Sequence, residues 1–355
     1  MNIHLYPVSF KKYSLILLSF FLFATVIELG MEFYFEKLYG DLTRVGYFTE
    51  HDFGWRSPQQ VIPPELFKDY PLAEADILVI GDSFSTPRAW QTRLVADGLK
   101  VATIHWNELT KSVVEHHEPL PDNLGGALRA AGFKGRYLVI ESIERYFQFR
   151  MKTLSKEHNP IVKHDIGVDA APFSKRERIS LSKLNGANWG VKALSNSIKL
   201  SLMSDKYLKS HIIEAIKFDG CQLFSNRLCG YALFVNEDFK KETFNSINNV
   251  LAANKNLQAV GIQPIWAIIP DKASIYLGYG EHNQHPYQNI WQQFAQYPEL
   301  IAPDLGADFT EKSRMTKDFY MPDDPHLSTN AYLYFGDFMS KGLHKLQANQ
   351  PNPFQ

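Results

Sequence analysis

The stretch that decides the fold is Asp76-Ile-Leu-Val-Ile-Gly-Asp-Ser-Phe-Ser85. Its apolar run ends at Gly81, where the chain can turn sharply, and Thr86 and Pro87 suit the N-cap and first position of a following helix. A short apolar run that leads through a glycine into a helix is typical of a strand in a parallel sheet. We therefore predict a buried strand with Ser83 in the turn at its carboxyl end.

The same alternation of strand and helix continues along the chain. We expect further strands at Val101–Trp106, Tyr137–Glu141 and Ile265–Ile269, and helices at about 86–97, Asn123–Ala131 and Glu237–Ala253. Continuous apolar strands separated by helices predict an α/β fold, a doubly wound, flavodoxin-like parallel sheet, over residues 71–347. Residues 152–234, with weak periodicity, are expected to be an insertion, either a cap over the functional site or a loop without a role, and 348–355 a disordered tail.

The N-terminus carries an apolar segment. Tyr13 to Ile27 contains no charge, but it is shorter than the ~20 residues that cross ~30 Å of hydrocarbon, so a span has to include residues up to 35. Because Lys11 and Lys12 precede it, we expect 1–12 in the cytoplasm, 13–35 as one N-terminal transmembrane anchor, 36–70 as a juxtamembrane linker and the rest outside the cytoplasm. A cleaved signal peptide is the alternative, but no small-x-small cleavage site follows the apolar core.

Composition limits the class of protein. The 355 residues are 45% hydrophobic, and 37 Lys+Arg against 38 Asp+Glu give a formal net charge of −1, which excludes disorder and argues against nucleic acid as a partner. Cys221 and Cys229 are too few for a thiolate zinc site. In an oxidising compartment they could close a small disulfide loop, and two unpaired thiols are the alternative.

A second polar segment, Asp323-Asp324-Pro325-His326-Leu327-Ser328, precedes the last helical pattern. In an open parallel sheet, functional groups gather at the carboxyl ends of strands. An aspartate three residues before His326 can orient its Nδ1 and leave Nε2 free to take a proton from Ser83. The two segments together predict a Ser-His-Asp triad.

The sequence contains no motif that supports metal or nucleotide binding. The runs Glu115-His116-His117-Glu118 and His282 with His285 lack the HExxH spacing of a zinc protease. Gly81 stands alone after its strand, so there is no glycine-rich phosphate loop. We expect no metal, no nucleotide and no cofactor.

These motifs carry a resemblance. The blocks Gly81-Asp82-Ser83 and Asp323-x-x-His326 resemble those of the SGNH/GDSL hydrolase superfamily. The chain looks most like the branch of alginate O-acetyltransferases of AlgJ and AlgX type. Segments similar to that branch are Val139–Arg145, Ile268–Tyr276 and, in the Gly-Trp-Arg run, His51–Arg56. The likeness covers about Asp76 to Leu346.

The resemblance implies a role for each matching residue. Ser83 would be the nucleophile, His326 the base and Asp323 the orienting acid, with Asp324 as the alternative because some members use an Asp-x-His spacing. There is no GxND block, so the usual oxyanion asparagine cannot be assigned. The backbone N–H of Ser83 is the expected oxyanion donor, with Asn107 a candidate on position alone.

Four residues near strand ends are expected to bind substrate. Glu141 and Arg145, with Glu144 beside them, could bind sugar hydroxyls or a carboxylate, or could form a structural ion pair. Lys272 could attract an anionic glycan, or could be solvated or paired. Tyr276 could line the cleft, or could serve packing.

The function implied is that of a membrane-anchored O-acetyltransferase in the inner membrane with its catalytic domain in the periplasm. It would move an acetyl group through an acetyl-serine to hydroxyls of an exopolysaccharide or another cell-envelope glycan. A membrane-bound O-acyltransferase is the expected acetyl supplier, since acetyl-CoA is cytoplasmic. The alternatives are an SGNH carbohydrate esterase or deacetylase, and a non-catalytic scaffold of a polysaccharide export complex.

Overall fold

Four parallel strands form the central sheet of the protein. The computed structural model describes residues 10–34, 40–109, 118–154, 186–202, 207–240, 242–278, 289–350 and 353–354. The strands pair in the order β2-β1-β3-β7, with bounds β1 Ile77–Gly81, β2 Val101–His105, β3 Tyr137–Ile143 and β7 Gln263–Ile269. In register, Gly81 pairs with His105, so the carboxyl ends of β1 and β2 lie at one edge of the sheet. The expected α/β fold with a parallel sheet is confirmed.

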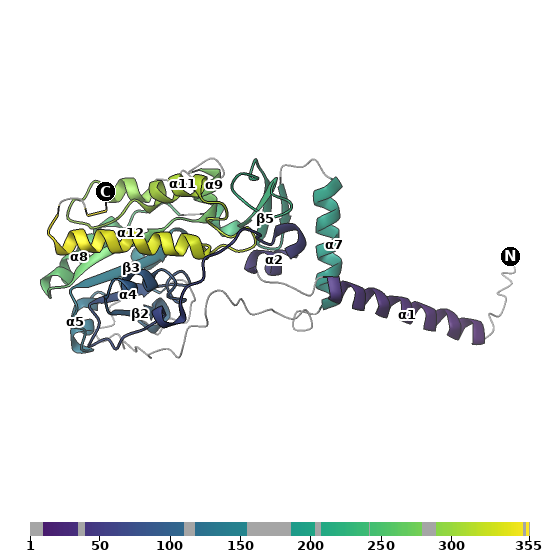
Figure 1. Ribbon diagram of the computed structural model, residues 1–355, viewed down its shortest axis with the longest axis horizontal. Coiled ribbons are helices and arrows are strands. Elements are labelled where there is room, and N and C mark those ends of the chain that lie inside the picture. The colour runs from purple at the N-terminus through teal and green to yellow at the C-terminus, as the bar shows by residue number, and fades with distance from the viewer. Residues whose placement is uncertain are drawn as a thin grey trace.

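Helices cover both faces of this sheet. Successive residues of β1 point to opposite faces: Ile77 and Val79 join one apolar core, and Leu78 and Ile80 join another. The first core contains α4 (Gln91–Ala96), α11 (Leu305–Met315) and α12 (Thr329–Gln347). The second contains α5 (Leu124–Ala130), α6 (Glu144–Lys152), α8 (Ile247–Ala259) and α10 (Ile290–Phe294). Figure 1 shows α12 lying along one side of the sheet.

The helix after β1 starts later than its sequence indicates. It was expected from Thr86, but α4 begins at Gln91. Arg88 has a φ of 58°, in the left-handed region that interrupts a right-handed helix. The preceding residues form a turn, in which the amides of Ser85 and Thr86 donate to the carbonyl of Asp82. α4 ends at Ala96, close to the expected end at 97, and Gly98 follows with a φ of 84°, in the left-handed region that commonly ends helices.

The insertion contains a small unit of its own. Its first half lies outside the described residues, and the second half forms α7 (Gly186–Leu202) and an antiparallel sheet in the order β4-β5-β6, with bounds Tyr207–Ser210, Ile213–Lys217 and Tyr231–Val235. The connection between β5 and β6 carries the disulfide Cys221–Cys229, which confirms the predicted pairing. The helix expected over Glu237–Ala253 is instead the short η4 (Asn236–Phe239) followed by α8.

The segment expected to be a linker, 36–70, is largely folded. It contains α2 (Asp41–Gly46), α3 (Glu50–Phe53) and η1 (Pro64–Leu66). Leu42, Phe48 and Phe53 are buried in one cluster with Ile213 and Leu233 of the insertion sheet. The segment folds because its apolar side chains are buried against the sheet of the insertion.

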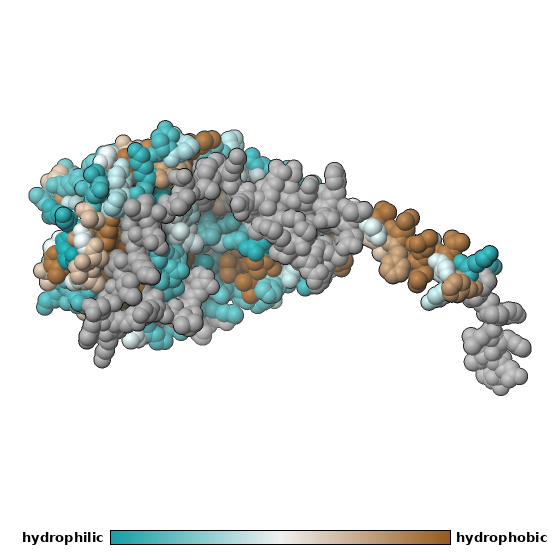
Figure 2. Space-filling view, turned by 90° about the horizontal axis from the view of Figure 1, so that it is seen from below, coloured by the Kyte–Doolittle hydropathy of each residue, from teal (hydrophilic) through white to brown (hydrophobic). Residues whose placement is uncertain are grey.

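One long apolar helix lies at the N-terminus. The described part of the chain contains one helix that could cross a membrane by length and composition, α1 (Phe10–Tyr34), and its apolar window Phe10–Ile27 is 0% buried. In Figure 1 it projects away from the rest of the molecule, and Figure 2 shows its apolar surface. At the other terminus, the centre of the Phe354 ring lies 5.7 Å from that of Phe338 on α12. This part of the tail, which was expected to be disordered, packs against α12.

Candidate active site

The structure brings Ser83 and His326 together at the carboxyl end of β1. Ser83 is exposed in the turn after Gly81, and His326 precedes α12. Ser83 Oγ lies 2.8 Å from His326 Nε2, and His326 Nδ1 lies 2.6 Å from Asp324 Oδ1. With the ring hydrogen on Nδ1, the imidazole donates to Asp324 and accepts from the Ser83 hydroxyl. This is the arrangement in which a histidine can remove the proton of a serine nucleophile.

The acid in contact with the histidine is Asp324, which corrects the preference for Asp323. Asp324 Oδ1 also accepts from the His326 amide at 3.0 Å, so the Asp-x-His turn itself aligns the two side chains. Asp323 is fully buried, and its carbonyl accepts from the amide of Leu42 at 3.0 Å. The carbonyl lies so close to Gly40 that a Cβ there would meet it at 1.9 Å. Asp323 therefore anchors α2 to the loop.

Asp324 sets the electrostatics of the imidazole. Burial of the ring opposes protonation, but the negative charge and hydrogen bond of Asp324 outweigh it and raise the pKa of His326 above 6.5. The Phe84 ring packs 4.9 Å from the imidazole and restricts its orientation. Asp324 Oδ2 accepts from the amide of Asp41 at 3.1 Å, so the acid is held from both sides.

Lys272 supports the loop that carries these residues, in place of the expected glycan contact. It begins α9 (Lys272–Leu277) and is 2% exposed. Its ammonium donates to the carbonyls of Met321 and Pro322 at 2.7 and 3.0 Å. Burial lowers the pKa of Lys272 to about 7, although the negative charges of Asp323 and Asp324 oppose that shift. A side chain enclosed in this way stabilises the loop that leads to Asp324 and His326.

Arg145 forms the structural ion pair that the sequence left open, and Glu144 forms hydrogen bonds beside it. Arg145 pairs with Asp271 and, at 3.2 Å, with Asp238. Glu144 Oε2 accepts from the amide of Asp271 at 2.9 Å and from Ser274 Oγ at 2.6 Å. These contacts join α6 to the start of α9, so both residues stabilise the packing of these two helices next to the site.

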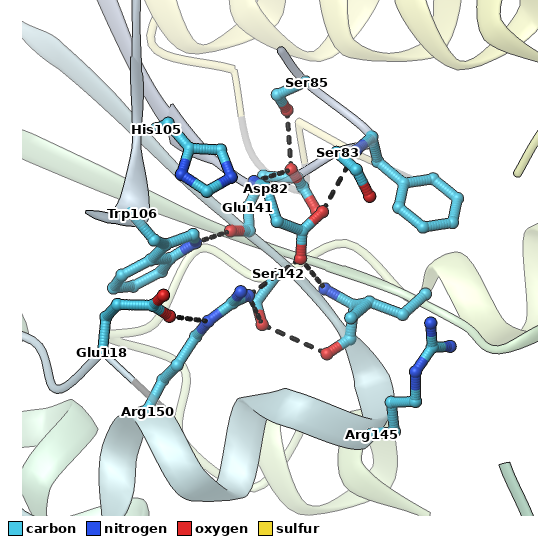
Figure 3. A network of polar contacts seen from close by, with 12 residues as sticks. Asp82, Ser83, Ser85, His105, Trp106, Glu118, Glu141, Ser142, Arg145 and Arg150 are labelled. Atoms are coloured by element: carbon cyan, nitrogen blue, oxygen red, sulfur yellow. Dashed lines mark hydrogen bonds and ion pairs between the residues drawn. The ribbon is translucent and has the colours of Figure 1, made fainter. Parts of the chain in front are cut away.

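Glu141 lies beneath the nucleophile turn. It is fully buried in β3, and its Oε2 accepts from Ser85 Oγ at 2.7 Å and from the Asp82 amide at 3.0 Å (Figure 3). Burial, and then the nearby charge of Asp82, raises the pKa of Glu141 well above its usual value of 4.5. A Cβ on Gly81 would come within 2.5 Å of the same oxygen, so glycine is required there. The residue that was expected to bind substrate is thus a buried support for the turn.

Asp82 is the charged partner in the same network. Burial favours its neutral form, but Arg150 outweighs burial and keeps the pKa of Asp82 below its usual value. Asp82 Oδ2 accepts from Arg150 at 2.8 Å and from the Ile143 amide at 3.0 Å, and Oδ1 accepts from the Phe84 amide at 3.1 Å. The guanidinium also stacks 4.8 Å from the centre of the Trp106 ring. Sequence reasoning missed Arg150 and Trp106, since no local motif marks them.

The backbone amide of Ser83 remains available for an oxyanion. Its neighbours, the amides of Asp82 and Phe84, donate to Glu141 and to Asp82 Oδ1, whereas the Ser83 amide donates to no residue that the structure describes. Asn107 is exposed in η2 (Trp106–Glu108), directly after β2 and at the same edge of the sheet. Its role as an oxyanion donor stays a prediction.

Tyr276 is a packing residue. Its ring lies 4.6 Å from that of Phe224, and its hydroxyl accepts from the Tyr320 amide at 3.2 Å. Burial raises the pKa of Tyr276. The packing interpretation that the sequence left open therefore describes this tyrosine better than a place in a cleft.

Within the described ranges, one group of side chains has the spacing of a metal site. Ligating atoms of Asp41, Asp324 and His326 lie within 4.8 Å of one another. Asp41 Oδ1 accepts from Arg44, and Asp324 and His326 are hydrogen-bonded to each other, so these atoms already have partners within the protein. The histidines at 116, 117, 282 and 285 lie outside the described residues.

Comparison with protein-family models, with curated proteins and with solved structures finds no match to this chain. The resemblance to the SGNH/GDSL superfamily therefore stays a prediction from the sequence motifs.

Proposed function

We propose that this protein is a membrane-anchored O-acetyltransferase of SGNH type. The observation that carries the proposal is the contact of Ser83 with His326 across 243 positions of sequence, with Asp324 behind the imidazole. The strand order and the helices on both faces of the sheet support a doubly wound SGNH fold. α1 supports anchoring in the inner membrane, with the catalytic domain in the periplasm.

The first half of the reaction loads the enzyme. His326 Nε2 takes the proton of Ser83 while Oγ attacks the carbonyl of an acetyl donor, and the charge that develops on the carbonyl oxygen is met by the Ser83 amide. The tetrahedral intermediate collapses, the bond to the leaving group breaks, and His326 returns the proton to that group. Asp324 stabilises the imidazolium that exists between these steps.

The second half transfers the acetyl group. His326 removes a proton from a sugar hydroxyl, the hydroxyl oxygen attacks the acetyl-serine, and Ser83 leaves with the proton. The acceptor is a hydroxyl of an exopolysaccharide or another envelope glycan. The acetyl group reaches the periplasmic side through a membrane-bound O-acyltransferase, since acetyl-CoA is made in the cytoplasm.

One observation favours an esterase as the second candidate. Ser83 is exposed, so water can reach an acetyl-serine as readily as a sugar can. In that case the same triad releases acetate, and the protein removes acetyl groups from a glycan.

The test uses the full chain in detergent with p-nitrophenyl acetate and oligosaccharide acceptors. We expect turnover by the wild type, loss of turnover in Ser83→Ala, and acetylated oligosaccharide among the products. Acetate release with every acceptor left unmodified would favour the esterase. Absence of turnover in the wild type, or equal turnover in Ser83→Ala, would favour a non-catalytic scaffold.

A further inference from the structure

Helix α7 has apolar residues on two opposite faces. One face packs against the molecule through Trp189, Ala193 and Leu200, which are buried. Trp189 Nε1 donates to the carbonyl of Arg44 at 2.9 Å, and Asn196 Nδ2 donates to that of Tyr47 at 3.0 Å. These contacts fix the rotation of α7 about its axis, so the direction of its other face is also fixed.

The other face is apolar and uncovered. Val191, Leu194, Ile198 and Leu202 are 60%, 48%, 49% and 81% exposed. At 3.6 residues per turn, these four side chains fall within a sector of about 80°. We call them the outer face of α7. A helix that is apolar on both sides is typical of one that is covered on both, and four adjacent exposed aliphatic side chains mark an interaction surface.

The position of α1 indicates what covers this face. α1 contacts α7, and in Figure 1 its C-terminal end meets one end of α7 and its axis runs away from the body of the molecule. The axis of α7 runs across that of α1 in the same view. If α1 crosses a bilayer, α7 lies along the plane of that bilayer, on the side of the molecule from which α1 leaves.

The charges beside the outer face fit a lipid surface. Lys192 and Lys199 lie about 100° around the helix from the apolar stripe and about two turns apart along its length. The ammonium of Lys192 lies 4.3 Å from the centre of the Tyr47 ring, and Lys199 is exposed. A lysine at the flank of an apolar helix face, as Lys199 is, can place its ammonium group among anionic headgroups while its aliphatic chain enters the acyl boundary.

We propose that the outer face of α7 rests in the headgroup region of the bilayer that α1 enters, on a surface containing anionic lipid. The inference rests on α1 being the inserted helix and is independent of acyl transfer. Two contacts with the membrane, one spanning and one interfacial, then fix the orientation of the whole domain relative to the bilayer.

The test places a fluorescent label at single introduced cysteines of the full chain. Cys221 and Cys229 are bonded to each other, so a maleimide dye reacts with the new thiol. Leu194→Cys and Ile198→Cys report on the outer face, and Met315→Cys, at an aliphatic position that is 66% exposed at the end of α11, is the matched control. Each is an exposed position, so the fold is retained. Ser19→Cys within α1 reports insertion of the anchor.

The labelled proteins are reconstituted in vesicles of phosphatidylethanolamine and phosphatidylglycerol that carry doxyl-labelled lipid. We expect blue-shifted emission at 194 and 198 and quenching by the doxyl lipid several-fold stronger than at 315. Quenching at 194 and 198 no stronger than at 315, with Ser19→Cys quenched, would overturn the proposal and leave the outer face to a protein partner. Lack of quenching at position 19 as well would overturn the inserted anchor and the inference together.

Discussion

Replacing Asp324 by asparagine tests the electrostatic core of the site. The substitution keeps the shape of the side chain and removes its charge. At the 2.6 Å between Asp324 Oδ1 and His326 Nδ1, with an effective dielectric constant of about 20, the attraction of carboxylate for imidazolium is about 6 kcal/mol. The two side chains are 10% and 22% exposed, and solvent screening reduces the figure to about 4 kcal/mol. At 1.36 kcal/mol for each tenfold change in rate, kcat should fall about 1,000-fold.

The same variant should change the dependence of activity on pH. The active form of His326 is neutral, so wild-type activity is lost as pH falls through the pKa of His326, which Asp324 holds above 6.5. Asp324→Asn removes that charge and moves the inflection of the residual activity to lower pH. The measurement is p-nitrophenyl acetate turnover by the full chain from pH 5 to pH 9, with circular dichroism to verify folding.

Asp323→Asn is the matched control, one residue away and equally conservative. The backbone carbonyl of Asp323 accepts from the amide of Leu42, whereas the carboxylate that accepts from His326 Nδ1 belongs to Asp324. We expect its kcat to stay within tenfold of the wild type and its pH inflection to stay in place. Equal losses in the two variants, or a shift of the inflection in Asp323→Asn alone, would refute the assignment of Asp324 as the acid.

Three further predictions concern the frame of the site. Glu141→Gln keeps the oxygen that accepts from the turn around Ser83, so its free energy of unfolding in urea should lie within about 1 kcal/mol of the wild type at pH 7. Glu141→Ala leaves two buried donors unpaired and should lower the free energy of unfolding by about 2–4 kcal/mol. Since the pKa of Glu141 is raised on folding, its stabilising contribution is present below pH 4.5 and is lost as pH rises through the folded pKa. Glu141→Gln should weaken that dependence, and an unchanged pH profile of stability would contradict a raised pKa of Glu141. Lys272→Met leaves the carbonyls of the loop before Asp324 without their donor, so kcat should fall tenfold or more with a smaller change in KM, and an unaltered kcat would show that the loop holds its shape without the ammonium. Cys229→Ser opens the loop closed by Cys221 and should lower the free energy of unfolding by about 2–3 kcal/mol, while an unchanged unfolding midpoint would show that the loop is held by packing alone.

The strands and the two segments that carry Ser83 and His326 could be predicted because their signals are local. An unbroken apolar run ending at Gly81 indicates a buried parallel strand wherever it occurs, and β1 follows it closely. The pairing of Ser83 with His326 followed from a general property of parallel sheets, which collect strand ends at one edge. The sequence left open whether Cys221 and Cys229 form a disulfide or stay unpaired, and the structure shows the disulfide.

The choice between Asp323 and Asp324 could not be made from spacing. Either aspartate can reach a histidine from a turn. Which of the two bonds to the imidazole depends on the contacts that other parts of the fold make with each aspartate. Here the backbone of α2, more than 280 positions away, binds the carbonyl of Asp323 and leaves Asp324 facing the ring. Contacts over such a separation have no signature in the local sequence.

The roles of the residues predicted to bind substrate also could not be decided from the local sequence. Glu141, Arg145 and Lys272 lie in or just after the carboxyl ends of strands, where substrate-binding residues gather, but burial decides what a charged side chain can contact. Lys272 is enclosed by carbonyls and by the rings of Phe224 and Phe234. Both rings belong to the insertion, whose fold the sequence left open. Because they cover Lys272, this lysine is a structural residue and does not reach a ligand.

The most direct test of the account is covalent labelling of the full chain with a fluorophosphonate, which forms a stable bond to an activated serine with loss of fluoride. Peptide mass spectrometry should locate the adduct on Ser83, and both Ser83→Ala and His326→Ala should abolish it while Asp323→Asn retains it. An adduct on another serine, or labelling of Ser83 at an unchanged rate in His326→Ala, would contradict the claim that the imidazole activates this hydroxyl.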